Sequence, residues 1–147
     1  MNGFYVKGRP SPGGSKRYVG HSKAGRAILV DMGGRNTKDW RDAVAAAARI
    51  AHRGAPLDCP VILTIVFYMK RPKAHYGKLG LREDAPRYHT NAPDATKLTR
   101  STEDALKGIC WVDDSCVARQ VIEKRYDDSE TYEQQNTGAW IKVEELL

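Results

Sequence analysis

The chain has 147 residues, of which 41% are hydrophobic and 29% charged; this composition predicts one globular domain over residues 1–147 and excludes a disordered or low-complexity protein. Its 24 Lys and Arg against 18 Asp and Glu give a net charge of +6, which favours a polyanionic partner without identifying it. No apolar run approaches the roughly 18 residues that span a membrane, and the N-terminal residues lack the hydrophobic region of a signal peptide, so we expect a cytoplasmic protein with no membrane contact.

The first half of the sequence predicts short strands followed by one helix. A strand is expected at residues 4–6, and residues 8–17 are rich in Gly, Pro and positive charge, which is typical of a basic loop. A second short strand is expected at residues 27–31. Thr37 stands where a helix N-cap belongs, and apolar residues recur every three or four positions along residues 38–53, which predicts a helix with one buried stripe.

The second half predicts the centre of a sheet and a second helix. Residues 60–69 are dense in β-branched and aromatic side chains, which predicts a strand buried on both faces. Residues 71–92 have no period and form a longer segment than structural loops normally do, so function or disorder is expected there. A helix is expected at residues 96–107, and strands at 117–126 and 139–143 are expected to be joined by a polar hairpin. The resulting fold class is α/β, a single-domain mixed β-sheet with two main helices packed against it.

Charge is concentrated in one part of the sequence. Residues 70–100 contain eight Lys or Arg against three Asp or Glu, whereas residues 101–114 contain four carboxylates and one lysine. Asp94 stands at the start of the second helix and Asp113 and Asp114 follow that helix, so these carboxylates can converge on a cation if both loops lie at one end of the sheet. Mg²⁺ on a basic surface predicts phosphodiester hydrolysis. The structural alternative is that Asp-Asp forms a turn and Asp94 caps the helix.

Three ordered motifs cover this region: PDATKLTR at residues 93–100, EDALKG at 103–108 and WVDDSCV at 111–117. They resemble the patterns P-D-x-D-[NK]-L-x-[KR], D-A-L-x-G and D-D-[SA]-x-V of the RusA family of Holliday-junction resolvases. The members of this family are crossover junction endodeoxyribonucleases, and this chain resembles a phage-like variant of them. The resemblance extends loosely over nearly the whole chain. It implies a RusA-like endonuclease domain that acts in DNA recombination or repair, in a bacterial cell or a phage-infected host.

The resemblance also implies roles for individual residues. It places metal-binding aspartates on Asp94 and Asp114, with Asp113 adjacent and included among the metal ligands. It places the family's catalytic lysine on Arg100, where the positive charge is kept as a planar fork. The implied catalytic set is therefore Asp94, Asp114, Arg100 and Asp113. The implied cofactor is Mg²⁺, with Mn²⁺ as an alternative, and the implied reaction is in-line attack of a metal-activated water on a phosphodiester.

One position departs from the family pattern. Thr96 stands where the pattern carries its second aspartate, which removes one negative charge and one strong ligand from the expected carboxylate set. The Thr96 hydroxyl is a candidate ligand, either directly or through a water molecule. The side chains of Asp113, Glu103 and Asp104 are candidates to supply the missing charge, and the sequence leaves these alternatives open.

The implied partner is branched DNA with a four-way junction, and the approximate two-fold symmetry of that substrate implies a homodimer that makes paired cuts. The residues expected to contact DNA are Lys16, Arg17, Lys70, Arg71, Lys73, Lys97 and Arg100. Two other functions stay open. One is a catalytically silent protein of the same fold that binds junctions or other branched DNA with an affinity indifferent to Mg²⁺, and the other is a basic RNA-binding module with no preference for branched DNA.

Overall fold

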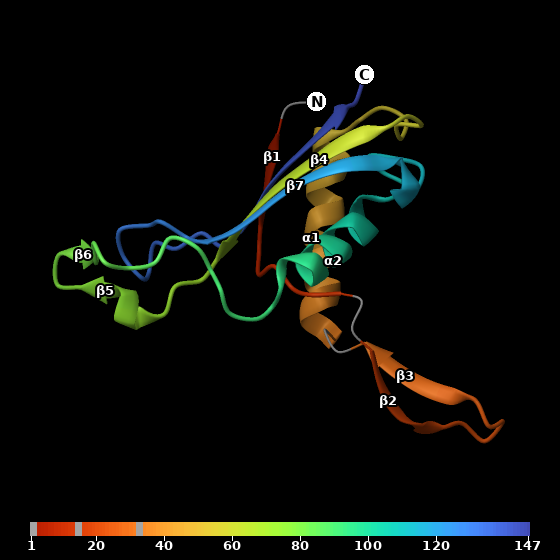
Figure 1. The fold of residues 1–147 in the computed structure, drawn as a ribbon, viewed down its shortest axis with the longest axis horizontal. Helices are drawn as coiled ribbons and strands as arrows, with labels where there is room; N and C mark the ends of the chain where they lie inside the picture. Colours follow the sequence, from red (N-terminus) through yellow and green to blue (C-terminus); the bar gives the residue numbers. More distant parts are fainter. Residues whose placement is uncertain (1–2, 14–15, 32–33) are drawn as a thin grey trace.

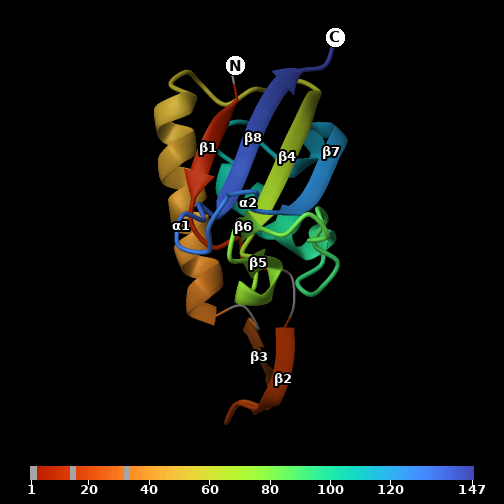
Figure 2. The same cartoon turned by 90° about the vertical axis from the view of Figure 1, so that its left-hand side faces the viewer.

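A four-stranded mixed sheet forms the centre of this computed structural model (Figures 1 and 2). Strand β4 (Val61–Met69) lies between β8 (Gly138–Glu145), which is antiparallel to it, and β7 (Val117–Tyr126), which is parallel to it. Strand β1 (Phe4–Lys7) pairs with β8, so the strand order is β1-β8-β4-β7 and β7 is an edge strand. The expected α/β fold with a mixed sheet is confirmed. The structure describes residues 3–13, 16–31 and 34–147.

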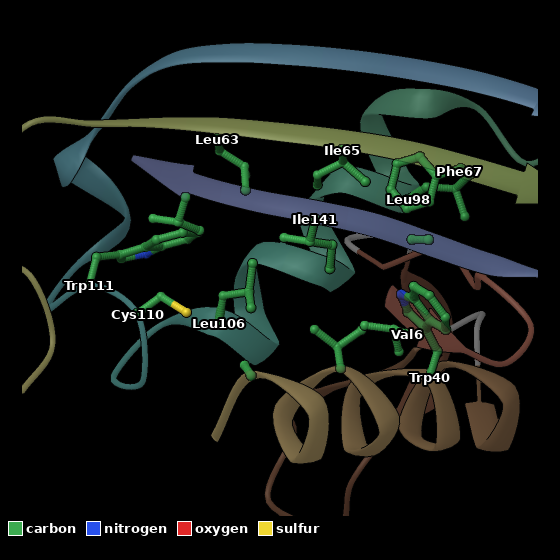
Figure 3. Packing of buried hydrophobic residues seen from close by; sticks show 14 of the residues in the cluster. Val6, Trp40, Leu63, Ile65, Phe67, Leu98, Leu106, Cys110, Trp111 and Ile141 are labelled. Atoms are coloured by element: carbon green, nitrogen blue, oxygen red, sulfur yellow. The ribbon is translucent and has the colours of Figure 1, made fainter. Parts of the chain in front are cut away.

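The hydrophobic core lies on one face of this sheet. Alternate residues of β4 are buried, and the residues between them are only half-buried. The expectation that β4 is buried on both faces was therefore wrong, because both main helices pack against the same face (Figure 3). The buried side chains that β4 contributes to the core are Val61, Leu63, Ile65, Phe67 and Met69.

Two helices cover the buried face. Helix α1 (Gly34–Ala51) begins earlier than expected, and Thr37 lies inside it rather than at its N-cap. The Thr37 hydroxyl instead donates to the carbonyl oxygen of Pro12 at 2.7 Å, which ties the N-terminal segment to the helix. Helix α2 (Ala95–Leu106) ends before Gly108, whose φ of 81° is the left-handed conformation expected after a helix. Within the described part of the chain, no helix is both long and apolar enough to cross a membrane.

Strands β7 and β8 do not form the hairpin that their spacing suggested. Strand β4 lies between them, so the polar segment 127–137 crosses from one side of β4 to the other. The buried Asp127 carboxylate organises this crossing, because it accepts hydrogen bonds from the backbone N–H groups of Ser129 at 2.8 Å and Asn136 at 2.9 Å. Pairing on both sides keeps the most apolar strand, β4, in the interior of the sheet.

Two segments extend from the sheet and its helices (Figures 1 and 2). One is a hairpin of β2 (Lys16–His21) and β3 (Ala27–Asp31). The expected strand β3 is confirmed. Strand β2 was not predicted, and it begins within the expected basic loop at residues 8–17. The other lies within residues 71–92. It contains a 3-10 turn, Lys73–His75, followed by the two-residue strands β5 (Tyr76–Gly77) and β6 (Gly80–Leu81).

Replacement of Phe67 by alanine is expected to lower the free energy of unfolding by about 3 to 5 kcal/mol, because Phe67 is fully buried and its removal leaves a cavity. Urea unfolding measures this change. The control is Val121→Ala, because the Val121 side chain is 51% exposed on the neighbouring strand, and a loss below about 0.5 kcal/mol is expected there. Equal losses in the two variants would contradict a core that lies on one face of the sheet.

Candidate active site

A pocket of about 430 Å³ lies between α2 and the edge strand β7. Residues of α2 form one wall, and residues of β7 and of the short turn before it form the other. The pocket therefore brings together side chains from all three sequence motifs. The polar residues that line it are Thr96, Thr99, Arg100, Glu103, Asp104, Asp114 and Gln120.

The carboxyl group of Glu103 has a raised pKa in this pocket. It is half-buried, and its Oε1 atom accepts a hydrogen bond from Nε2 of Gln120 on β7 at 2.5 Å. Burial and the negative charge of Asp114 raise the pKa of Glu103 to about 7. Two carboxylates therefore act on each other in a partly dehydrated space, an arrangement that a bound cation stabilises.

The adjacent residues Asp113 and Asp114 have different surroundings. Asp114 begins a 3-10 turn, Asp114–Cys116, and lines the pocket, where its Oδ1 atom accepts a hydrogen bond from Nε1 of the buried Trp111 at 2.9 Å. Asp113 accepts hydrogen bonds from the backbone and hydroxyl of Ser115, at 3.1 and 2.7 Å, and pairs with Lys107 at 3.2 Å. These partners lower the pKa of Asp113 to about 2. Of the two aspartates, Asp114 lines the pocket and Asp113 does not.

Asp94 lies at the N-terminus of α2, directly before the pocket wall. Its Oδ2 atom accepts a hydrogen bond from the backbone N–H of Lys97 at 3.0 Å, so Asp94 caps the helix, as the structural alternative proposed. The side chain is 56% exposed and is not part of the pocket lining. Nζ of Lys124 on β7 donates to the carbonyl oxygens of Asn91 and Pro93, each at 2.7 Å, which fixes the loop that carries Asp94. Metal binding by Asp94 stays a prediction.

Thr96 and Arg100 lie one turn apart on the pocket face of α2, and both are exposed. Within the described residues, no hydrogen bond or ion pair engages the Arg100 guanidinium. Its charge nevertheless acts on Glu103, because it opposes the rise in the pKa of that carboxyl group. Arg100 is therefore available to bind a phosphate in a bidentate manner at this pocket.

Besides Arg100, three of the residues expected to contact DNA lie on β2 and α2. The backbones of Lys16 and Arg17 belong to β2, but their side chains lie outside the described residues. Lys97 is exposed in the first turn of α2, with Nζ 3.9 Å from Oδ1 of Asp94. DNA contacts of these three residues stay predictions.

Lys70 and Lys73 lie together on one aromatic ring. Both are exposed, and their Nζ atoms lie 4.8 and 5.3 Å from the centroid of Tyr132. The Tyr132 ring thus attracts both ammonium groups by cation–π interaction at the protein surface. A contact with the DNA backbone stays the prediction for both residues.

Arg71 has a structural role, contrary to the expectation of a DNA contact. It is 3% exposed, and its guanidinium donates to the carbonyl oxygens of Asp127 at 2.5 Å and Pro86 at 2.7 Å. The guanidinium carbon also lies 5.1 Å from the centroid of Tyr126. Arg71 thus joins the end of β4 to two loops, and its donors are directed into the protein. The sequence could not distinguish Arg71 from Lys73, because both carry a positive charge and only their burial differs.

Replacement of Arg71 by alanine is expected to lower the free energy of unfolding by about 1.5 to 3 kcal/mol, because it removes hydrogen bonds from a charged group and leaves two carbonyl oxygens without their donor. Chemical unfolding measures the effect. Lys73→Ala removes an exposed cation from the same segment and is expected to cost less than about 1 kcal/mol. A variant Arg71→Ala with unchanged stability and weakened DNA binding would restore the original prediction for Arg71.

Glu103 is the residue whose importance was least visible in the sequence, where it was one of several candidates for the missing charge. The available signal was spacing. Thr96, Arg100 and Glu103 are separated by four and three residues, the intervals that bring side chains to one helix face. What the spacing could not show is that this face is opposed by Asp114.

Carboxylates and an unengaged guanidinium in one pocket, on a basic protein, are typical of metal-dependent enzymes that cleave phosphodiesters. Residues 8–134 match the family described as endodeoxyribonuclease RusA. The chain belongs to this family of Holliday-junction-resolving endodeoxyribonucleases, so the resemblance and the activity expected from the three motifs are confirmed. No curated protein matches the chain.

Nucleases of the RusA family are generally metal-dependent, and the donors of the pocket fit a hard cation. Glu103 and Asp114 offer carboxylate oxygens, and Thr96 offers a hydroxyl oxygen. Residues 3–13, 16–31 and 34–147 contain no group of three or more His, Cys, Asp or Glu side chains that could hold a metal ion together. Mg²⁺ is commonly held by one or two carboxylates together with waters and substrate phosphates, and this pocket meets that requirement.

Proposed function

We propose that this chain resolves four-way DNA junctions by Mg²⁺-dependent hydrolysis of phosphodiesters at the pocket between α2 and β7. The observation that carries the proposal is that Arg100 and Asp114, which match separate RusA motifs, line the same pocket. Mn²⁺ is expected to replace Mg²⁺, because oxygen donors of this kind suit both ions.

Each residue of the pocket has a distinct part in this proposal. Asp114 would hold the metal ion, and the hydrogen bond from Trp111 fixes the orientation of its carboxylate. The ion, when bound, polarises the phosphodiester and lowers the pKa of a water molecule. Arg100 donates to the non-bridging phosphate oxygens and stabilises the negative charge that develops on them. The Thr96 hydroxyl is placed to orient a water molecule or a phosphate oxygen in the same pocket.

The basic side chains outside the pocket would position the DNA. Lys70, Lys73 and Lys97 are exposed, and we propose that they bind phosphates together with Lys16 and Arg17. A homodimer would present two equivalent pockets to a junction that has approximate two-fold symmetry, so that two strands are cut in a paired manner.

The experiment is cleavage of a labelled synthetic four-way junction and of a linear duplex with the same sequence, with Mg²⁺, with Mn²⁺ and with EDTA. The proposal predicts paired, symmetric nicks in the junction alone, only when metal is present. Tight junction binding without cleavage under either metal would favour a catalytically silent binder. Equal binding to junction, duplex and RNA would favour a general nucleic-acid-binding module.

A further inference from the structure

We propose that Glu103 supplies the second metal-binding carboxylate of this active site, together with Asp114, in place of the aspartate that the RusA pattern carries at the position of Thr96. The inference rests on the proposed function, because it assigns a ligand to the metal ion of that site. With Glu103 as a ligand, the carboxylates that bind the metal ion in this chain would differ from those that the family pattern implies.

The first step is the position of Glu103 on α2. Seven residues separate Thr96 from Glu103, which is about two helical turns and about 10 Å along the helix axis. Both residues line the pocket, with Arg100 between them on the same face. A carboxylate at residue 103 therefore enters the same pocket as a carboxylate at residue 96 would, but nearer the C-terminal end of α2.

The second step is the orientation of the two carboxylates. Gln120 holds Glu103 from β7, and Trp111 holds Asp114 from the turn before β7. Within the described residues, these hydrogen bonds engage Oε1 of Glu103 and Oδ1 of Asp114. The other oxygen of each carboxylate, Oε2 and Oδ2, is left for a cation. Two carboxylates from different elements are thus positioned by neutral donors, which do not satisfy their charge.

The other nearby carboxylates are less suited than Glu103 to bind a metal ion together with Asp114. Asp113 is paired with Lys107. Asp104 lines the pocket, but its Oδ2 atom lies 3.3 Å from Nη2 of Arg41 on α1. Asp94 is not part of the pocket lining, and its carboxylate caps α2.

The last step is the electrostatic cost of this arrangement without metal. Glu103 is half-buried and lines the same pocket as Asp114, so two carboxylates share a partly dehydrated space and repel each other. Within the described residues, no lysine or arginine forms an ion pair with Glu103 or Asp114. A divalent cation between them would remove the repulsion, and Mg²⁺ needs only one or two carboxylates when water and phosphate complete its ligands.

The test measures Mn²⁺ binding to the full chain without DNA, by the electron paramagnetic resonance signal of the free ion. Glu103→Gln keeps the shape of the side chain and an acceptor for Gln120, and it is expected to raise the Kd for Mn²⁺ at least about tenfold. Asp104→Asn is the matched control and is expected to change the Kd less than about threefold, because Asp104 is engaged by Arg41. In EDTA, Glu103→Gln is expected to melt no lower than the wild type, which reports an intact fold.

Equal Kd values for the wild type and Glu103→Gln would overturn the inference, and so would equal losses in Glu103→Gln and Asp104→Asn, which would indicate a general charge effect. Junction cleavage by the wild type with Mg²⁺ is measured in parallel. Cleavage by the wild type together with normal Mn²⁺ binding by Glu103→Gln would refute the role of Glu103 alone. Absence of cleavage would refute the proposed function, and the Mn²⁺ titration would still decide whether Glu103 binds the ion.

Discussion

Replacing Asp114 by asparagine is expected to reduce the single-turnover rate of junction cleavage at least about 100-fold, because it removes a charged metal ligand from the pocket. The fold should be retained, since the asparagine carbonyl oxygen can still accept the hydrogen bond from Trp111. Junction affinity measured in EDTA should stay within about threefold of the wild type, because Asp114 is acidic and does not attract phosphates. The loss is therefore expected in the rate and not in binding.

Asp113→Asn is the control for this prediction. It removes the same charge from the adjacent residue, whose carboxylate is held by Ser115 and Lys107 outside the pocket lining. We expect a reduction in cleavage below about tenfold, since a neighbouring charge acts only through the local field. A larger loss for Asp113→Asn than for Asp114→Asn would place the metal on Asp113 and contradict the arrangement described for this turn.

The second large effect is expected for Arg100→Ala, which should reduce the cleavage rate at saturating protein by about 10² to 10³-fold. Arg100 lines the pocket, and within the described residues its guanidinium has no hydrogen-bonded partner, so it can stabilise charge on the scissile phosphate. Arg100→Lys should recover part of the rate, because it restores the charge but not the planar fork. Rates at saturating protein, measured on the four-way junction, test both variants.

Lys97→Ala is the matched control for Arg100, because Lys97 is an exposed cation in the first turn of the same helix and is not part of the pocket lining. It is expected to weaken junction binding and to reduce the salt dependence of binding by about one unit of slope, with a normal rate at saturation. If Arg100→Ala behaved in the same way, Arg100 would position the DNA and would not stabilise the transition state.

The positions of most elements followed from local patterns in the sequence. The β-branched run of β4 and the apolar spacing of α2 each predicted an element within a few residues of its observed bounds. Strand pairing did not follow, because β7 and β8 are adjacent in sequence but both pair with β4. Burial on one face of β4 was also missed, since an apolar run does not report whether a second layer covers it.

Some residues of the site could be predicted from the sequence, and others could not. The motifs placed Arg100 and Asp114 in the active site, and the structure brings both of them to one pocket. The motifs could not separate Asp113 from Asp114, because the difference lies in the hydrogen bonds from Ser115 and Trp111. They also could not single out Glu103, whose surroundings depend on the packing of α2 against β7.

The position of the bound metal ion tests the proposed site between α2 and β7 most directly. Fe²⁺ bound in place of Mg²⁺ generates hydroxyl radicals with ascorbate and peroxide, and these radicals cut the protein backbone next to the ion. We expect cuts in α2 near Glu103 and in the turn at Asp114, and we expect excess Mg²⁺ to suppress them. Cuts confined to the segment around Asp94, with none near Glu103 or Asp114, would contradict a metal site between α2 and β7.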